Sequence, residues 1–194
     1  MLTLTAPAAK AQPDDADALD MTLSQNLESP EVAKRAKEYV RTHIDQLRRS
    51  LVKKGLEVKS LRDGEVLQIT IPCQDLFGIG STELKPRGLD LLRGLSMVVR
   101  EPGRYKVLVA VHTDDTGDEQ YADSISAARA NAIDDGLWQI AGEKDTNVIP
   151  YGIGKDEPVA SNTTRENRAR NRRVEIYIVP DNALLEMAGM KVKR

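Results

Sequence analysis

The segment that most restricts the fold is the run "YKVLVAVH" at residues 105–112. Successive residues of a β-strand point to opposite faces of a sheet, and both alternating rows of this run are largely apolar. A strand with two apolar faces is expected in the interior of a sheet that is covered on both sides. The chain is therefore expected to build a layered domain around this central strand.

Patterns on either side of this strand predict further elements. They are a hairpin around Arg62-Asp63-Gly64, a helix with Pro86 in its first turn, a helix over 123–141, a short strand at 148–151 and a final strand in "RVEIYIV" at 173–179. From residue 65 onward the order is strand, helix, strand, helix, strand, strand. The sequence thus predicts an α+β fold: a two-layer α/β sandwich of the order β-α-β-α-β-β, with an N-terminal helix and an added hairpin strand.

The first 29 residues do not show the periodicity of a packed element. Residues 1–29 are rich in Ala, Asp, Pro and Ser, which is typical of a disordered tail. Ala9-Lys10-Ala11 precedes Gln12 with the small-x-small pattern of a signal-peptidase site, so a remnant of a signal peptide is an equal alternative.

An amphipathic helix is expected over residues 30–55, beginning at Ser29-Pro30 and ending at Gly55. Its apolar residues recur at helical spacing, with Lys and Arg on the other faces. This stripe packs either on the domain or on a second copy of itself, and we favour the domain. The main domain is expected over residues 56–180, and a C-terminal extension follows at 181–194.

Composition excludes several classes of function. A net charge of -2 and a pI near 5.8 argue against a general polyanion binder. The arginines of residues 165–173 lack interleaved aromatic residues and are diluted by glutamates, so no nucleic-acid binding is expected. Cys73 is the only cysteine, which excludes an internal disulfide and a cysteine-based zinc cluster. No stretch approaches the roughly 20 apolar residues that a membrane-spanning helix needs.

Arg129 occupies a position where the pattern calls for an apolar residue. At about 100° per residue, the helix at 123–141 has one apolar sector, and Arg129 falls near its middle. A guanidinium keeps its charge, so its removal from water requires anionic partners or hydrogen bonds. A structural ion pair, or a head group that escapes past the helix end, would satisfy it. The functional interpretation is an arginine that binds a carboxylate.

The loop "VHTDDTG" at residues 111–117 is compatible with two kinds of functional site. His112, Asp114 and Asp115 would be the ligands of a metal-dependent hydrolase, but His112 and Asp114 converge only if the strand continues through residue 113. There is no HExxH motif, no paired-carboxylate motif elsewhere and no nucleophile elbow, so we expect no catalytic residue, no metal and no cofactor. An aspartate of this loop, Asp114 or Asp115, and Arg129 at one strand-to-helix junction would instead suit a ligand of both charges, such as an amino-acid end group.

Several ordered motifs resemble one known family. They are "LFGIGSTELKPRGLDLL", "VHTDDTGDEQYADSISAARANAI", "YGIGKDEPVASN" and "RENRARNRRVEIYI". Over about residues 56–180 the chain is similar to the OmpA-like C-terminal domain, the peptidoglycan-associating module of bacterial envelope proteins. The resemblance implies non-covalent binding of the peptide stem of peptidoglycan through the free amino-acid end of meso-diaminopimelate.

The resemblance also assigns roles to residues of this chain. Asp114 and Arg129 are expected to hold the diaminopimelate group, Thr113 and Gly117 to shape the loop, and Asn171 and Arg172 to brace or border the pocket. Tyr121 and Asp123 complete the expected ligand-binding set: Thr113, Asp114, Gly117, Tyr121, Asp123, Arg129, Asn171 and Arg172.

Some positions depart from the family pattern. Val111 stands where glycine is usual, and Ala122 stands where the family has an asparagine whose amide bonds the ligand. Asp123, next to Ala122, is a candidate substitute for that amide. Asn167 also replaces a usual glycine, and asparagine tolerates positive φ better than most residues, so the turn is expected to survive.

The resemblance implies a domain that anchors a cell-envelope protein to the wall in the periplasm of a Gram-negative cell, with association with the outer membrane as a further expectation. The expected partners are the peptide stem and, through the N-terminal helix, other envelope proteins. The alternative, motivated by Ala122, is an envelope protein-interaction module whose ligand pocket is degenerate.

Overall fold

The computed structural model describes residues 21–101, 103–142 and 147–191. They contain a five-stranded sheet in the order β1-β2-β5-β3-β4, formed by β1 Val58–Leu61, β2 Val66–Pro72, β3 Tyr105–His112, β4 Val148–Gly154 and β5 Arg173–Pro180. Strand β3 pairs in parallel with β4 and antiparallel with β5, and all its residues are buried. The predicted central strand is therefore confirmed.

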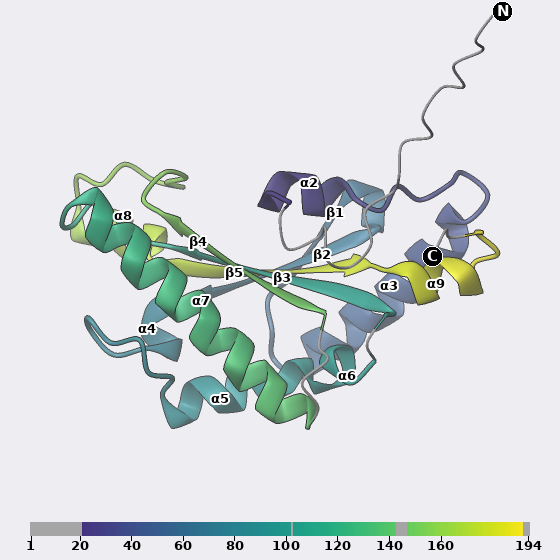
Figure 1. Ribbon diagram of the computed structural model, residues 1–194, viewed down its shortest axis with the longest axis horizontal. Coiled ribbons are helices and arrows are strands. Elements are labelled where there is room, and N and C mark those ends of the chain that lie inside the picture. The colour runs from purple at the N-terminus through teal and green to yellow at the C-terminus, as the bar shows by residue number, and fades with distance from the viewer. Residues whose placement is uncertain (1–20, 102, 143–146, 192–194) are drawn as a thin grey trace, which may run out of the picture.

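Helices cover the two faces of the sheet unequally (Figure 1). The helices are α2 Leu23–Glu28, α3 Lys37–Lys53, α4 Cys73–Leu76, α5 Pro86–Leu92, α6 Ser96–Val99, α7 Glu119–Ala141, α8 Arg165–Asn171 and α9 Asn182–Met187, with 3-10 turns η1 Arg62–Gly64 and η2 Arg93–Leu95. Helices α3, α5, α6 and α7 lie on one face, where the main hydrophobic core forms. Helix α2 covers part of the other face over a smaller cluster. The predicted α+β class and layered arrangement are confirmed.

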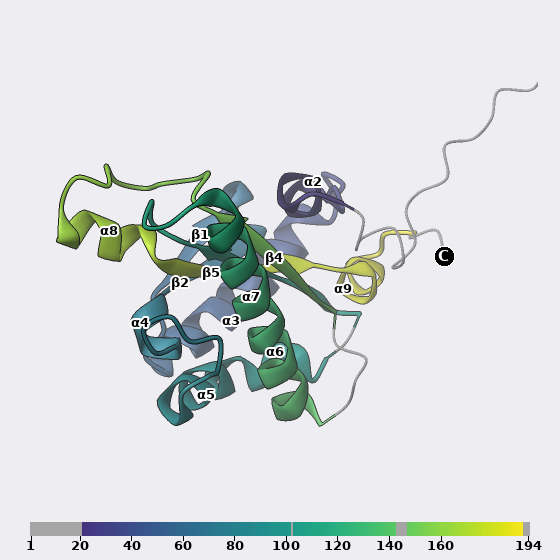
Figure 2. The ribbon, with the colours of Figure 1, turned by 60° about the vertical axis from the view of Figure 1, so that its left-hand side comes forward.

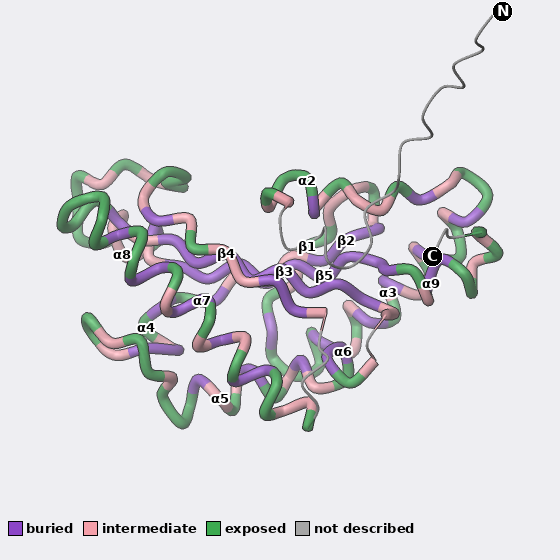
Figure 3. Tube along the Cα trace, viewed as in Figure 1, coloured by how far each residue is buried: buried purple, intermediate pink, exposed green. Residues whose placement is uncertain are grey.

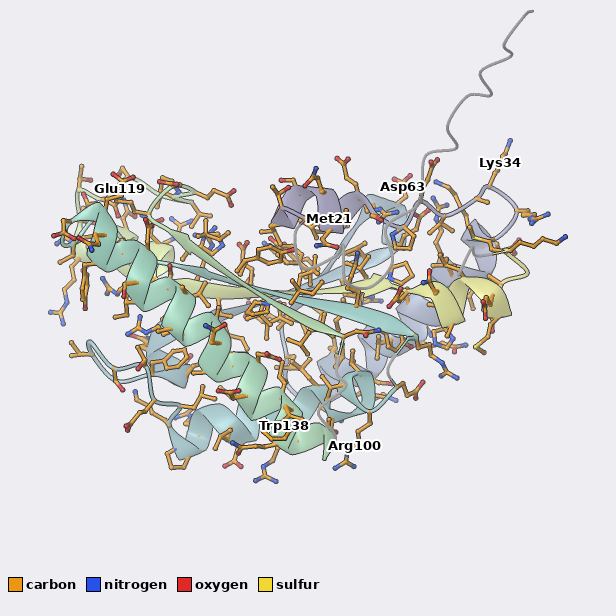
Figure 4. All side chains as sticks on the ribbon, viewed as in Figure 1. Met21, Lys34, Asp63, Arg100, Glu119 and Trp138 are labelled. Carbon is orange, nitrogen blue, oxygen red and sulfur yellow. The ribbon has the colours of Figure 1, made fainter. Side chains whose placement is uncertain are left out.

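Burial follows this layering (Figure 3). Strands β2, β3 and β5 are buried along most of their length, whereas edge strand β1 has no buried residue and β4 is buried only at its two ends. The outer sides of the helices are exposed. Arg100 and Trp138 lie at the same end of the molecule, away from Glu119 at the start of α7 (Figure 4). There the Arg100 guanidinium donates to the carbonyl of Ile140 at 3.0 and 3.2 Å, which ties the end of α6 to the last turn of α7.

The prediction of a tail over residues 1–29 is wrong for the last part of that range, since residues 23–28 form α2. Thr22 and Gln25 cap this helix reciprocally, because the side chain of each accepts a hydrogen bond from the backbone N–H of the other. Asn26 is fully buried, receives a hydrogen bond from Lys106 at 2.6 Å and donates to Tyr151 at 2.6 Å. The helix was missed because six residues are too few to show a helical periodicity. The predicted cleavage pattern at Ala9-Lys10-Ala11 lies outside the described residues.

The predicted helix over 30–55 begins later than expected. Helix α3 starts at Lys37 and ends at Lys53, close to the predicted stop, while Ser29-Pro30 is a cis peptide bond rather than a helix start. Its stripe of Val40, Ile44, Leu47 and Leu51 is buried in the main core. Packing on the domain, the favoured alternative, is confirmed.

Two further helices lie where no helix was predicted. Helix α8 lies in the arginine-rich segment 165–173, for which no helix was predicted. Asn167 lies within this helix, so Asn167 needs no positive φ. Helix α9 belongs to the C-terminal extension and buries Leu184 and Leu185 in the main core. Of the helices in the described residues, none is both long and apolar enough to span a bilayer.

Candidate binding pocket for a charged ligand

A pocket of about 450 Å³ opens where β3 ends and α7 begins. Figure 2 shows α4 and α8 at this same end of the sheet, beside the first turns of α7. The lining residues are Cys73, Gln74, Phe77, Gly78, Ile79, Gly80, Lys85, Thr113, Asp114, Thr116, Tyr121, Ala122, Ile125, Arg129, Arg165 and Arg172. Five of the eight predicted ligand-binding residues are among them: Thr113, Asp114, Tyr121, Arg129 and Arg172.

Close packing of α7 against the sheet positions the pocket's helical wall. Gly152 of β4 allows this approach, because a Cβ there would lie 2.5 Å from the backbone nitrogen of Ala127. Asp118 caps the helix by accepting a hydrogen bond from the backbone of Tyr121 at 2.7 Å. The helix therefore begins at Glu119, four residues before the predicted start, and its first turns face the end of β3.

Arg129 is buried in this wall, with 6% of its surface exposed. Its Nε donates to the carbonyl of Ser81 at 2.9 Å, and Nη2 donates to the carbonyl of Gly78 at 3.3 Å. The guanidinium also lies over the Phe77 ring, 5.1 Å from its centroid. None of the ion pairs among the described residues includes Arg129. Its positive charge thus reaches the pocket without an acidic partner there, which excludes the structural ion pair as its explanation within that part of the chain.

Asp114 supplies the negative charge of the pocket, and its side chain is 5% exposed. Oδ1 accepts a hydrogen bond from the backbone of Thr116 at 2.9 Å, and Oδ2 forms an ion pair with Arg172 Nη1. Burial alone would raise the pKa of this carboxyl, but the hydrogen bonds from Thr116 and Arg172 outweigh it and lower the pKa. Asp114 is therefore ionised at neutral pH.

Thr113 and Tyr121 form other parts of the lining. The Thr113 hydroxyl is buried and has no hydrogen-bond partner among the described residues. Tyr121 is half exposed, and its ring packs against Gly117, where a Cβ would lie 3.0 Å from the ring. Gly117 also has φ of +91°. A residue with a side chain would therefore be disfavoured at this position twice, by the positive φ and by the close Tyr121 ring. Gly117 therefore lies in the loop without lining the pocket, and its part in ligand binding stays a prediction.

Asp123 and Asn171 also lie outside the pocket lining. Asp123 is exposed and faces the backbone of β4, where a Cβ on Gly154 would lie 2.5 Å from Asp123 Oδ1. Asn171 is fully buried, accepts hydrogen bonds from the backbone of Val159 and Ala160 at 2.9 and 3.0 Å, and donates to the Ala160 carbonyl at 2.8 Å. Asn171 therefore braces the loop that precedes α8.

The three residues considered for a metal do not converge. His112 is buried outside the pocket lining, where its Nε2 lies 3.4 Å from Glu175 Oε2. Asp115 is exposed, whereas Asp114 lines the pocket. In the described part of the chain, no group of three or more His, Cys, Asp and Glu side chains is arranged to hold a metal.

Cys73 is the one nucleophile of high intrinsic reactivity in the lining. Burial raises the pKa of its thiol to about 11, although Arg129, Arg172 and Arg173 act in the opposite direction. The thiol stays protonated at neutral pH, and a protonated thiol is a poor nucleophile. Its position therefore fits a packed wall residue.

Comparison with known proteins identifies the family. Residues 76–172 match the model of the OmpA family, which is half of the chain. The chain belongs to the OmpA family. The chain is similar to a probable lipoprotein, YiaD, of Escherichia coli, with 34% identity over 127 residues, which cover 66% of this chain and 58% of that protein. It is also similar to the peptidoglycan-binding protein ArfA of Mycobacterium tuberculosis, with 32% identity over 122 residues, which cover 55% of this chain and 36% of that protein.

Solved structures agree with this membership in the OmpA family. The cell wall anchor of the T6SS from Pseudomonas aeruginosa matches with a TM-score of 0.59 and 27% identity, over 71% of this chain and 97% of that one. A putative MotB-like protein from Desulfovibrio vulgaris matches with a TM-score of 0.63 and 25% identity, over 75% and 93%. OmpA-like domains are non-enzymatic binding and anchoring modules, so the prediction that the chain is not an enzyme is confirmed.

The OmpA-family match covers only part of each relative. The chain spans 58% and 64% of the length of two curated Escherichia coli lipoproteins that it matches. The matched segment, residues 76–172, contains every predicted ligand-binding residue and every lining residue except Cys73 and Gln74.

Sequence reasoning missed part of the pocket wall. The turn at Gly78-Ile79-Gly80, together with Lys85 and Arg165, lines the pocket but was not predicted to do so. The turn is part of "LFGIGSTELKPRGLDLL", which contributed only to the family resemblance. Its two glycines around an isoleucine, between a strand and a helix, are a pattern typical of a tight turn and are the signal from which this wall could have been predicted.

Proposed function

We propose that this chain is a non-catalytic domain that binds peptidoglycan non-covalently through the zwitterionic end of meso-diaminopimelate in the peptide stem. The observation that carries the proposal is the buried Arg129 guanidinium, which faces the pocket without an acidic partner among the described residues. A buried charge in such a position is stabilised by a ligand of opposite charge. A ligand carboxylate supplies that charge, and its planar shape fits the fork of a guanidinium.

Asp114 is the counterpart for the ligand's ammonium. An ionised carboxylate only accepts hydrogen bonds, and an ammonium only donates them. The bonds from Thr116 and Arg172 hold the Asp114 carboxylate in place while leaving it lone pairs for a further donor. The unpartnered Thr113 hydroxyl lies in the same wall and offers one more hydrogen bond to the ligand.

The relatives support the cellular setting of this proposal. One is named a peptidoglycan-binding protein, another an outer-membrane lipoprotein, and one solved structure is a cell wall anchor. By this similarity we place the chain in the periplasm of a bacterial envelope, associated with the outer membrane and anchored to the wall. Since the apolar stripe of α3 is buried in its own domain, contact with other envelope proteins would use the polar face of that helix.

Sedimentation with purified sacculi tests the function. The chain is expected to sediment with sacculi that contain diaminopimelate and to remain in solution with sacculi whose stems carry lysine, which lacks the second carboxylate. Arg129→Ala and Asp114→Ala are expected to abolish sedimentation, whereas Asp115→Asn, at an exposed neighbouring carboxylate, retains it. If wild type does not sediment, the alternative of an interaction module with a degenerate pocket replaces the proposal. If both alanine variants sediment like wild type, the site is misassigned.

A further inference from the structure

A tight turn projects one apolar side chain at the rim of the pocket. The backbone of Ser81 donates to the carbonyl of Gly78 at 3.2 Å, which places Ile79 and Gly80 at the two central positions of the turn. Gly80 has φ of +65°, as the second central position of a type II turn requires. A β-bridge between Phe77 and Leu84 closes the base of this loop. The turn is therefore built to hold its central residues in one place.

Ile79 is fully exposed at the corner of this turn, with a relative exposure of 108%, and it lines the pocket. Single exposed apolar residues are common on protein surfaces and need no explanation by themselves. Here, however, a second large exposed hydrophobic residue, Tyr121, lines the same pocket from the first turn of α7. Two exposed apolar side chains thus line a cavity whose charged lining residues are Lys85, Asp114, Arg129, Arg165 and Arg172.

Arg129 ties this apolar rim to the charged interior. Its guanidinium donates to the carbonyls of Gly78 and Ser81, the first and last residues of the turn. The group that receives the ligand carboxylate in the proposed function is therefore the group that fixes the turn. Ile79 consequently has a defined place relative to a bound carboxylate, although its own side chain makes no contact with the rest of the core.

We infer that Ile79 and Tyr121 form an apolar subsite at the mouth of the pocket, which takes the aliphatic side chain of the stem residue next to the bound diaminopimelate. The inference rests on the proposed function and adds what lies beyond the zwitterionic end group. The neighbour meant is the stem residue that follows diaminopimelate, which is alanine and carries an apolar methyl group. Covering Ile79 with that residue removes apolar surface of both from water, which favours binding.

Calorimetric titration of purified variants tests this subsite with two ligands, free meso-diaminopimelate and a stem peptide in which alanine follows it. Ile79→Ser is expected to weaken binding of the stem peptide about 3- to 10-fold, given the usual gain per area of apolar surface buried. Binding of free meso-diaminopimelate stays unchanged, because that ligand has no neighbouring residue. Ile79→Leu keeps wild-type affinity for both ligands. Val52→Ser removes an exposed apolar residue of α3, outside the pocket, and serves as the matched control.

The outcomes separate this inference from the proposed function. If Ile79→Ser binds the stem peptide like wild type, or loses affinity equally for both ligands, the apolar subsite is wrong. If wild type binds neither ligand, the proposed function fails, and the subsite fails with it. The thermal midpoint of Ile79→Ser is expected to equal that of wild type, since the side chain is exposed and the turn is held by backbone bonds.

Discussion

Arg129→Lys keeps the positive charge at the centre of the pocket and changes only its geometry. In the wild-type chain Nε and Nη2 contact Ser81 and Gly78, and the rest of the fork faces the pocket. A lysine ammonium is a single point charge, so it cannot hold both carbonyls and still bind a carboxylate with two parallel hydrogen bonds. Hydrogen bonds to charged groups contribute about 1.5–3 kcal/mol each. Loss of one of them corresponds to roughly 10- to 100-fold weaker binding.

The same variant also affects folding. Loss of one contact between the charged group and a backbone carbonyl costs about 1.5–3 kcal/mol, which lowers the thermal midpoint of a chain of this size by about 3–12 °C. Titration with meso-diaminopimelate and a thermal melt therefore give separate readouts for Arg129→Lys. Arg87→Lys, at an exposed arginine outside the pocket lining, is the control and is expected to change neither. Binding of Arg129→Lys within about twofold of wild type would refute the bidentate role, because that role predicts at least a tenfold loss.

Three further predictions follow from the geometry. The pKa of Asp114 lies below its usual 3.8, so the ionised carboxylate supports ligand binding and folding above about pH 4. Ligand affinity and the free energy of unfolding should both decline as pH falls through the lowered pKa, whereas Asp114→Asn should bind the ligand weakly at every pH in the same titrations. Burial opposes ionisation of Glu175, but contacts with His112, Tyr177 and Arg173 hold its pKa at about 2 rather than 4.5, so wild type loses this stabilisation only as pH falls from 4.5 toward 2. Glu175→Gln leaves the buried Arg173 without its anionic partner and should cost about 3–5 kcal/mol in denaturant unfolding at pH 7; a cost below 1 kcal/mol would contradict the role of the pair. Gly152→Ala should lower stability by about 1–3 kcal/mol, because its Cβ meets the α7 backbone, and unchanged unfolding would show that the helix shifts freely.

The two residues that carry the proposed function were recognisable in the sequence for different physical reasons. Arg129 stood out because a charge in the apolar sector of a helix violates the helical pattern, and the structure places it in a buried wall. The loop that holds Asp114 was located by the end of a strand that is apolar on both faces, and the resemblance to the OmpA-like domain then selected Asp114 rather than Asp115. The pattern within one element was therefore sufficient for Arg129 but not for Asp114.

The partners of these residues depended on tertiary packing, which no local pattern contains. Arg172 lies 58 residues after Asp114 and reaches it because β5 pairs with β3. The turn at Ile79 meets Arg129 across a separation of about 50 residues. Helices α2 and α8 were missed because a six- or seven-residue helix spans fewer than two full turns, too short for an apolar stripe to be distinguished.

The binding free energy lost by having Ala122 in place of an asparagine decides between the proposed function and the degenerate pocket. Ala122 is buried in the lining, so the hydrogen bond that an asparagine amide would give the ligand is missing there. A hydrogen bond between neutral groups contributes about 0.5–1.5 kcal/mol, which is roughly 2- to 12-fold in affinity. In the proposed function, the charged contacts of a ligand with Asp114 and Arg129 would contribute about 1.5–3 kcal/mol each, and both residues line the pocket with suitable charge. Loss of the amide would therefore lower the affinity for a zwitterion, but the pocket would still select its ligand by charge. This favours a working binding site over a degenerate one.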